Sequence, residues 1–189
     1  MEKPMRVITG SARGRKLATL EGRDVRPTTD MVKEAMFSIL HFEMEQAMVL
    51  DLFAGSGQLG IEALSRGARC CIFVDQSTKA QSVIKQNLAA TQLSSKARVA
   101  AMDAKAFLKT TNETFDVVLL DPPYDSGILP EILPLAAARM SDGGAILCET
   151  RLHEELPEEC GPFVLKKKYR YGKIALTLYR KREEDGEEE

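Results

Sequence analysis

The sequence predicts an α/β fold built on a mostly parallel, seven-stranded sheet, with an antiparallel strand at the C-terminus and a small N-terminal arm. Two observations carry this prediction. From Met48 onward, short apolar runs alternate with stretches of helical period, which is typical of parallel strands joined by crossover helices. Near the C-terminus, two strand-like runs follow one another with a short turn between them, as in a β-hairpin.

Five strands are expected in the parallel part of the sheet. They are the runs at residues 49–53, 70–74, 98–102, 116–120 and 145–149. Between the second and third runs, Ala80, Val83, Ile84, Asn87 and Leu88 recur at helical spacing and predict a helix with one buried stripe. The hairpin is expected where residues 166–173 lead into the apolar run 174–179.

A further helix is expected before the first strand. Thr28, Thr29 and Asp30 are candidate N-caps, and the apolar residues of 31–40 recur with helical spacing. Upstream, residues 6–26 show no helical stripe and predict a small hairpin. We therefore divide the chain into an arm at residues 1–27, a main domain at 28–182 and an acidic tail at 183–189, which we expect to be disordered.

Composition limits the class of protein before any motif is considered. The chain has 189 residues, which fits a single main domain. It contains no apolar run long enough to span a bilayer and no signal-peptide pattern, so a cytoplasmic protein is expected, as a monomer. Its four cysteines and two histidines lack metal-ligand spacing, so no metal is expected.

The formal net charge of −2 conceals blocks of opposite sign. Residues 1–26 carry seven Lys or Arg against three acids, residues 166–182 carry eight Lys or Arg and no acid, and the tail carries six acids. Without the tail the charge is −2 + 6 = +4. Either basic block alone favours a solvated face. Together they favour a polyanionic partner.

A glycine-rich loop follows the first expected strand. Gly55, Gly57 and Gly60 let a ligand approach the backbone at the start of a helix, where amide groups can bind an anion. The same glycines, with Asp75 twenty residues after Gly55, also satisfy the dinucleotide-binding pattern. The pattern by itself therefore leaves NAD and S-adenosylmethionine open.

Charge favours S-adenosylmethionine. Asp51 lies beside the loop, where it would repel a pyrophosphate and attract the ammonium and sulfonium of S-adenosylmethionine. Asp75 and Asp103 also follow strands, at the edge where open α/β sheets bind ligands, although each could serve only as a helix cap. The expected cofactor-binding residues are Asp51, Phe53, Ala54, Gly55, Ser56, Gly57, Asp75, Gln76, Asp103 and Ala104.

The fourth strand opens into Asp121-Pro122-Pro123-Tyr124, which we take as the catalytic loop. The two prolines restrict the backbone, so the Asp121 carboxylate and the Pro122 carbonyl are held in a fixed geometry. Two such acceptors can orient an exocyclic base amine toward a methyl group, and Tyr124 can stack on the base. The alternative is that the prolines only terminate a strand. None of the four cysteines lies in a Pro-Cys or Thr-Cys context, which argues against methylation of a pyrimidine carbon.

These motifs, taken with those of the N-terminal region, resemble the RsmD family of 16S rRNA guanine-N2 methyltransferases over nearly the whole chain. The resemblance rests on four segments: residues 6–10 with 13–17, residues 26–30 with 32–35, residues 51–57, and residues 121–124. The last two are shared by many methyltransferases, whereas the first two are much more specific to this family. In place of Tyr124, members often have phenylalanine, and the acidic tail has no assigned role.

The resemblance implies a Rossmann-like, class I S-adenosylmethionine-dependent methyltransferase that modifies the N2 amine of one guanine in 16S rRNA. It implies that the substrate is a small ribosomal subunit particle, and that the segment containing Arg26 and Thr28 lies near the cofactor and the substrate. Together with the basic charge of the arm, this gives Arg13, Arg15, Lys16, Arg26 and Thr28 as candidate substrate-binding residues.

Three other functions stay open at this point. An N6-adenine methyltransferase would use the same loop chemistry, although the chain leaves almost no residues for a separate target-recognition domain. An NAD-binding oxidoreductase shares the glycine loop, but it leaves Asp51 and the loop at Asp121 unexplained. A non-catalytic RNA-binding module would bind RNA without turnover.

Overall fold

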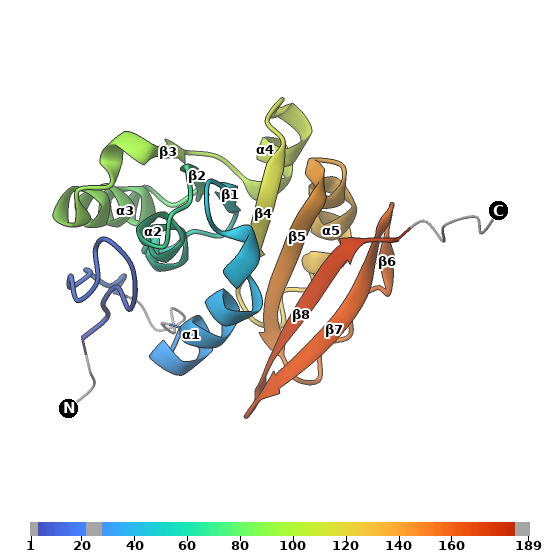
Figure 1. Cartoon of the computed structure of the whole chain (residues 1–189). Helices are drawn as coiled ribbons and strands as arrows, with labels where there is room; N and C mark the ends of the chain where they lie inside the picture. The colour runs from blue at the N-terminus through green and yellow to red at the C-terminus, as the bar shows by residue number, and fades with distance from the viewer. Residues whose placement is uncertain (1–3, 22–27, 184–189) are drawn as a thin grey trace.

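The computed structural model describes residues 4–21 and 28–183 (Figure 1). The helices are α1 Asp30–Ile39, η1 His41–Glu43, α2 Gln58–Ser65, α3 Thr78–Thr91, η2 Ser94–Lys96, α4 Ala104–Thr110 and α5 Leu129–Ala137. The strands are β1 Met48–Asp51, β2 Cys70–Val74, β3 Ala97–Ala100, β4 Phe115–Leu120, β5 Met140–Arg151, β6 Glu159–Cys160, β7 Phe163–Tyr171 and β8 Ile174–Lys181. Except for Glu183, the acidic tail lies outside the described residues.

The strands form one sheet in the order β3-β2-β1-β4-β5-β8-β7-β6. Strands β1 to β5 pair in parallel, and β8 pairs antiparallel with both β5 and β7. This confirms the mostly parallel sheet and its antiparallel C-terminal strand. The expected number of seven strands is wrong, because the two residues of β6 pair with the start of β7 and add an eighth strand at the edge.

Two strands differ in length from the sequence prediction. Strand β1 ends at Asp51, two residues early, because the chain turns at Leu52 to begin the glycine loop. Strand β5 is longer than expected at both ends and includes Gly143 and Gly144. Pairing extends it, since Met140 is in register with Phe115 of β4 and Arg151 is in register with Ile174 of β8.

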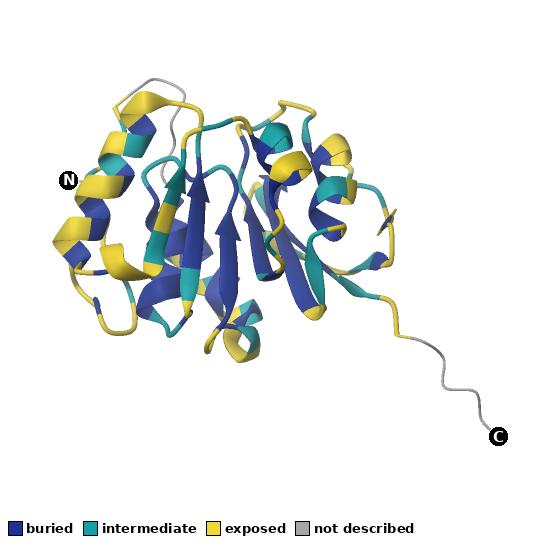
Figure 2. Ribbon diagram, turned by 90° about the horizontal axis from the view of Figure 1, so that it is seen from above, coloured by how far each residue is buried: buried dark blue, intermediate teal, exposed yellow. Residues whose placement is uncertain are grey.

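Helices cover both faces of the sheet (Figures 1 and 2). Helices α1, α2 and α3 pack on one face, where Val49, Val117 and Leu147 point. Helices α4 and α5 pack on the other, against Leu50 and the alternate residues of its neighbours. Both faces are therefore apolar, as a doubly covered parallel sheet requires. Among the described residues, no helix is long and apolar enough to cross a bilayer.

Thr29 caps α1, because its hydroxyl accepts a hydrogen bond from the backbone N–H of Val32 at 3.3 Å. The arm forms a short antiparallel bridge between Arg6 and Lys16 and packs against α2. There the buried Glu62 carboxylate accepts the backbone N–H groups of Ile8 and Thr9 at 2.9 and 3.0 Å. The described part of the arm is thus joined to the main domain by hydrogen bonds to a buried carboxylate.

Candidate active site

The carboxyl ends of β1, β2, β3 and β4 meet at one edge of the sheet, because parallel strands all end on the same side. A cavity of about 520 Å³ opens at this edge. Eight of the ten expected cofactor-binding residues line it, and so do all four residues of the expected catalytic loop. The eight are Phe53, Ala54, Gly55, Ser56, Asp75, Gln76, Asp103 and Ala104.

The other two expected cofactor residues, Asp51 and Gly57, are not in the wall of the cavity. One carboxylate oxygen of Asp51 accepts the backbone N–H of Gly60 at 3.0 Å. Gly57 begins α2 with a left-handed backbone, φ 81°, which a side chain would strain. A Cβ on Gly60 would lie 2.3 Å from the ring of Phe73, so the loop packs tightly onto β2.

The second carboxylate oxygen of Asp51 is buried without a hydrogen-bond partner. Burial raises the pKa of Asp51 to about 7, and the nearby Asp75 adds to the shift, whereas the bond from Gly60 opposes it. A buried acceptor with no partner is stabilised by a nearby cation. Asp51 is therefore suited to a positively charged ligand beside the glycine loop.

Asp75 and Asp103 are engaged with backbone amides at the rim of the cavity. The Asp75 carboxylate accepts the N–H of Gly55 at 3.0 Å and that of Ser77 at 2.9 Å, which ties the glycine loop to the end of β2. Asp103 caps α4, because it accepts the N–H of Ala106 at 3.0 Å. Both carboxylates line the cavity while they also fix the loops around it.

The catalytic corner is formed by Asp121, Thr28, Glu149 and Tyr124. The Thr28 hydroxyl lies 3.3 Å from an oxygen of Asp121 and 3.4 Å from an oxygen of Glu149. The Tyr124 hydroxyl donates to the other oxygen of Glu149 at 2.7 Å. Asp121 and Tyr124 come from the loop after β4, Glu149 from β5 and Thr28 from the segment before α1, so only the fold brings them together.

The Thr28 hydroxyl has one hydrogen, yet it faces two carboxyl groups. With both groups ionised, one of the two contacts has no hydrogen in it. A proton on either carboxyl satisfies both contacts. Burial raises the pKa of Asp121 well above its ordinary value, and the Glu149 charge raises it further. Burial also raises the pKa of Glu149. The pair is therefore built to hold a shared proton.

Tyr124 is fixed on two sides. Its hydroxyl is bound to Glu149, and the Arg151 guanidinium carbon lies 5.0 Å from its ring centroid. Burial, followed by the bond to Glu149, raises the pKa of the Tyr124 hydroxyl, which keeps that group a donor. The ring is part of the cavity wall. It is thus an oriented apolar surface beside Asp121.

Glu149 and Arg151 were not among the residues expected from the sequence. Glu149 could have been found, because it is an acid at the end of the expected strand 145–149, just as Asp51 is the last residue of β1. Nothing in the sequence indicates the stacking of Arg151 on Tyr124, which depends on the end of β5 lying beside the catalytic loop.

The candidate substrate-binding residues do not share one location. Thr28 lines the cavity, and Arg26 lies outside the described residues. Arg13, Arg15 and Lys16 are exposed on the arm and absent from the cavity wall, to which the arm contributes Met5, Thr19, Leu20 and Glu21.

Fold and cavity together define a class of protein, the S-adenosylmethionine-dependent methyltransferases. The residues present fit this cofactor, because the cavity offers the Asp75 carboxylate for a ribose and apolar walls from Phe53, Val74 and Met102 for an adenine ring. Asp51, next to the glycine loop, adds a buried carboxylate oxygen without a partner for a cationic centre. The described residues contain no cluster of His, Cys, Asp and Glu that could hold a metal ion.

Comparison with known proteins identifies the family. The model of the family described as Conserved hypothetical protein 95 matches residues 5–180. Ribosomal RNA small subunit methyltransferase D of Escherichia coli is 35% identical over 185 residues, which are 97% of this chain and 92% of that protein. YlbH of Bacillus subtilis is 43% identical over 183 residues, 94% of this chain and all of that protein. The solved structure of Escherichia coli yhhF has 34% identity and a TM-score of 0.84, over 96% of this chain and all of that chain.

The chain therefore belongs to the RsmD family, and it is a methyltransferase that uses S-adenosylmethionine. This confirms the resemblance found in the sequence and excludes an oxidoreductase.

Proposed function

We propose that this methyltransferase modifies the exocyclic N2 amine of one guanine in the RNA of the small ribosomal subunit. The relatives at 35 and 36% identity, from Escherichia coli and Haemophilus influenzae, are named for small-subunit ribosomal RNA. The observation that carries the amine as target is the catalytic corner, where a rigid loop holds Asp121 at the wall of the cavity. A particle containing the small-subunit RNA is the proposed substrate, and the enzyme acts as a monomer.

For this reaction the protein has to orient a weak nucleophile. The lone pair of an aromatic amine is delocalised into the ring, so both its hydrogens must be held to expose that lone pair. The Asp121 carboxylate and the Pro122 carbonyl supply two acceptors, and Tyr124 supports the base from its face. When S-adenosylmethionine is bound it supplies an activated methyl group. The residues of the corner then hold the reacting nitrogen and take up its surplus proton.

Asp121 receives that proton, and Thr28 and Glu149 determine how readily. Because the two carboxyls share one hydroxyl, a proton placed on Asp121 is stabilised by donation toward Thr28, which in turn donates to Glu149. A network of this kind can contribute about 10²- to 10⁴-fold to the rate when it acts as a general base. The cofactor-facing residues take no part in this step. They are proposed to contact the ribose through Asp75 and the adenine through Asp103 and Ala104.

The proposal is tested by incubating the purified protein with S-adenosylmethionine and small ribosomal subunits from a strain that lacks its own RsmD enzyme. Nucleoside mass spectrometry of the recovered RNA should show one new N2-methylguanosine. A new N6-methyladenosine would contradict the proposed target base. RNA binding without any methylated nucleoside would mean that the catalytic assignment is wrong.

A further inference from the structure

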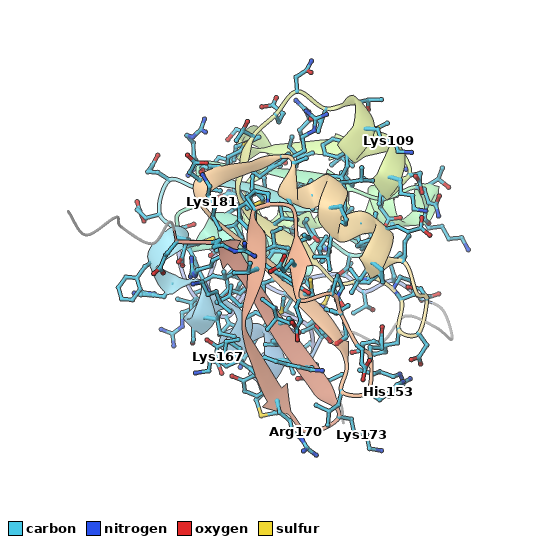
Figure 3. All side chains as sticks on the ribbon, turned by 90° about the vertical axis from the view of Figure 1, so that its right-hand side faces the viewer. Lys109, His153, Lys167, Arg170, Lys173 and Lys181 are labelled. Carbon is cyan, nitrogen blue, oxygen red and sulfur yellow. The ribbon has the colours of Figure 1, made fainter. Side chains whose placement is uncertain are left out.

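A group of basic side chains lies beside the active site without lining its cavity. These side chains surround a separate cavity of about 370 Å³ between the end of β5 and the turn that joins β7 to β8. Its walls are Arg151, Leu152, His153, Arg170, Gly172 and Lys173. Figure 3 shows His153, Arg170 and Lys173 gathered at one end of the molecule, with Lys109 and Lys181 toward the other.

The direction of the strands explains why this cavity is next to the catalytic loop. Strands β5 and β7 both pair antiparallel with β8, so they run in the same direction as each other. Strand β4 also runs parallel to β5. The ends of all three strands, at Leu120, Arg151 and Tyr171, therefore lie on the same edge of the sheet. The β7–β8 turn, at Gly172 and Lys173, is placed on the edge where Asp121 acts.

Arg151 joins the two cavities. Its guanidinium stacks on the ring of Tyr124, and its Nε lies 3.1 Å from a carboxylate oxygen of Asp125. Asp125 also contacts the His153 ring at 3.0 Å. The side chains that follow the catalytic loop are therefore in direct contact with those of the basic cavity.

The charge of the cavity is positive after its acids are counted. The acids that face it are Asp125, which is paired with Arg151, and Glu154, whose carboxylate accepts the backbone N–H groups of Asp125 and Arg151 at 3.3 and 3.1 Å. Within the described residues, Arg170 and Lys173 form no ion pair with any carboxylate. Both are exposed, so two cations without an ion-pair partner among the described residues face the solvent here.

The walls of the cavity are held in place without a ligand. The Lys168 ammonium donates to the backbone carbonyls of Leu152 and Glu154 at 3.3 and 3.4 Å, which ties the loop after β5 to strand β7. The backbone N–H of Leu152 donates to the carbonyl of Lys173 at 2.9 Å. The backbone on which the basic side chains stand is thus held by contacts within the fold.

We propose that this basic cavity binds a backbone phosphate of the RNA strand that presents the target base, with Arg151, Arg170 and Lys173 as its contacts. The inference rests on the proposed RNA substrate. Guanidinium groups match the geometry of phosphate oxygens, and Arg151 is in contact with Tyr124, the ring on which the target base is proposed to stack. The site would hold the strand on one side while the catalytic corner holds the base, as recognition of splayed single-stranded RNA requires.

The basic residues of the arm are placed less favourably. The backbone N–H groups of Ser11 and Ala12 donate to the carbonyl and hydroxyl of Ser65 at 2.8 and 2.9 Å. Ser65 ends α2, whose eight residues begin at the glycine loop, so this part of the arm lies about 12 Å from the catalytic edge. Arg13 and Arg15 follow directly and are predicted from the sequence to bind RNA.

Three double charge reversals with the same change in charge separate these possibilities: Arg170→Glu with Lys173→Glu, Arg13→Glu with Arg15→Glu, and Lys109→Glu with Lys181→Glu as the control. Lys109 lies near the end of α4 and Lys181 ends β8, both away from the catalytic edge. Each variant is assayed for methylation of unmodified small ribosomal subunits across a series of salt concentrations. Calorimetry with S-adenosylhomocysteine shows whether each variant is folded.

The reversal at Arg170 and Lys173 should raise the KM for the ribosomal particle roughly tenfold or more, with unchanged affinity for S-adenosylhomocysteine. It should also reduce the log-log salt slope by about 0.7, since the loss of one phosphate contact with a single strand removes about 0.7 from that slope. The control should change neither value. An unchanged KM in the Arg170 and Lys173 variant, or an equal rise in all three variants, would overturn the inference.

Should the Arg170 and Lys173 reversal fail to fold, the neutral pair Arg170→Gln with Lys173→Gln carries the same test with a smaller expected rise. Failure of the proposed function is recognised separately. In that case the unaltered protein itself produces no N2-methylguanosine, and no KM exists to compare.

Discussion

The carboxylates at the cofactor end of the cavity and those at the catalytic corner differ in their hydrogen-bond partners. Asp75 and Asp103 accept backbone N–H groups at 2.9 to 3.0 Å and so help to build the loops on which they stand. Asp121 and Glu149 share a single hydroxyl at 3.3 and 3.4 Å, and burial raises the pKa of both. The first pair is satisfied before any ligand binds. The second pair keeps unused capacity for hydrogen bonds and protons.

From this difference we expect Asp75 and Asp103 to serve cofactor binding, and Asp121 and Glu149 to serve the reaction. A carboxylate that is already satisfied contributes a fixed, charged surface, which suits a cofactor bound in the same way each time. A carboxyl with a raised pKa and an incomplete set of partners can accept a proton that appears during a reaction. Substitutions at the two ends should consequently change different measurements.

The largest effect is expected at Asp121. Asp121→Ala should lower kcat by about 10²- to 10⁴-fold, because it removes the acceptor that orients and deprotonates the amine. Calorimetry should show unchanged binding of S-adenosylhomocysteine, since the residue does not contact the glycine loop. Methylation of the ribosomal particle at a near-normal rate would mean that the Asp-Pro-Pro segment only terminates β4.

A smaller effect, on a different measurement, is expected at Asp75. Asp75→Ala should weaken binding of S-adenosylmethionine, because it loses a charged contact to the ribose and frees the loop at Gly55. Each lost hydrogen bond to a charged group contributes about 1.5 to 3 kcal/mol. The control is Asp142→Ala, an exposed carboxylate paired with Lys181 far from the cavity. Equal affinity in the two folded variants would remove Asp75 from the cofactor site.

The electrostatic coupling between Asp121 and Glu149 is tested by Glu149→Gln, which keeps the shape of the side chain and removes its charge. Because the Glu149 charge raises the pKa of Asp121, its removal lowers that pKa. In the proposed mechanism the reaction requires ionised Asp121, so the acidic limb of the kcat–pH profile should move to lower pH. Tyr124→Phe is the matched control, because it deletes the hydroxyl bound to Glu149 and leaves both carboxyls in place.

In the Tyr124→Phe variant the acidic limb should not move to lower pH. If the limb stays in the same place in Glu149→Gln as well, the two carboxyls are not coupled during the reaction, and Glu149 has only a structural role.

The smallest of the expected changes is one in the pH dependence of stability, and it concerns Asp51. Burial raises its pKa from 3.8 to about 7 in the folded protein, so the folded state binds this proton more tightly than the unfolded state. Its stabilising contribution is complete below pH 3.8 and is lost as pH rises to about 7. Over that window the free energy of unfolding should fall by up to roughly 1.4 kcal/mol per pH unit for this group.

Urea unfolding of the unaltered protein and of Asp51→Asn, measured at several pH values, tests this expectation. The fall in unfolding free energy should be shallower in Asp51→Asn, because the amide does not titrate. Asp121 and Glu149 also have raised pKa values, so part of the fall should remain. Parallel curves for the two proteins would mean that Asp51 is already ionised in the folded state.

The alternation of strands and helices, the glycine loop after β1 and the rigid loop after β4 could all be predicted from the sequence. Each of these depends on neighbours in the chain. Apolar residues at a period of two or 3.6 select strands or helices, glycines permit the positive φ of 57° at Gly55, and two adjacent prolines restrict the backbone after Asp121. The family was recognisable for the same reason, since its motifs are continuous segments.

Contacts between residues that are far apart in the chain could not be predicted from local patterns and depend on the tertiary structure. Along the chain, Thr28 is 93 residues from Asp121 and 121 residues from Glu149. Its hydroxyl contacts both carboxyl groups only because β4 and β5 end beside the segment before α1. Likewise, the direction of β7 places Arg170 at the catalytic edge, and the packing of the arm against Ser65 holds its turn away from that edge. Hydrogen bonds and charges act over a few ångströms in space, so these interactions are fixed by strand order and packing and not by spacing in the sequence.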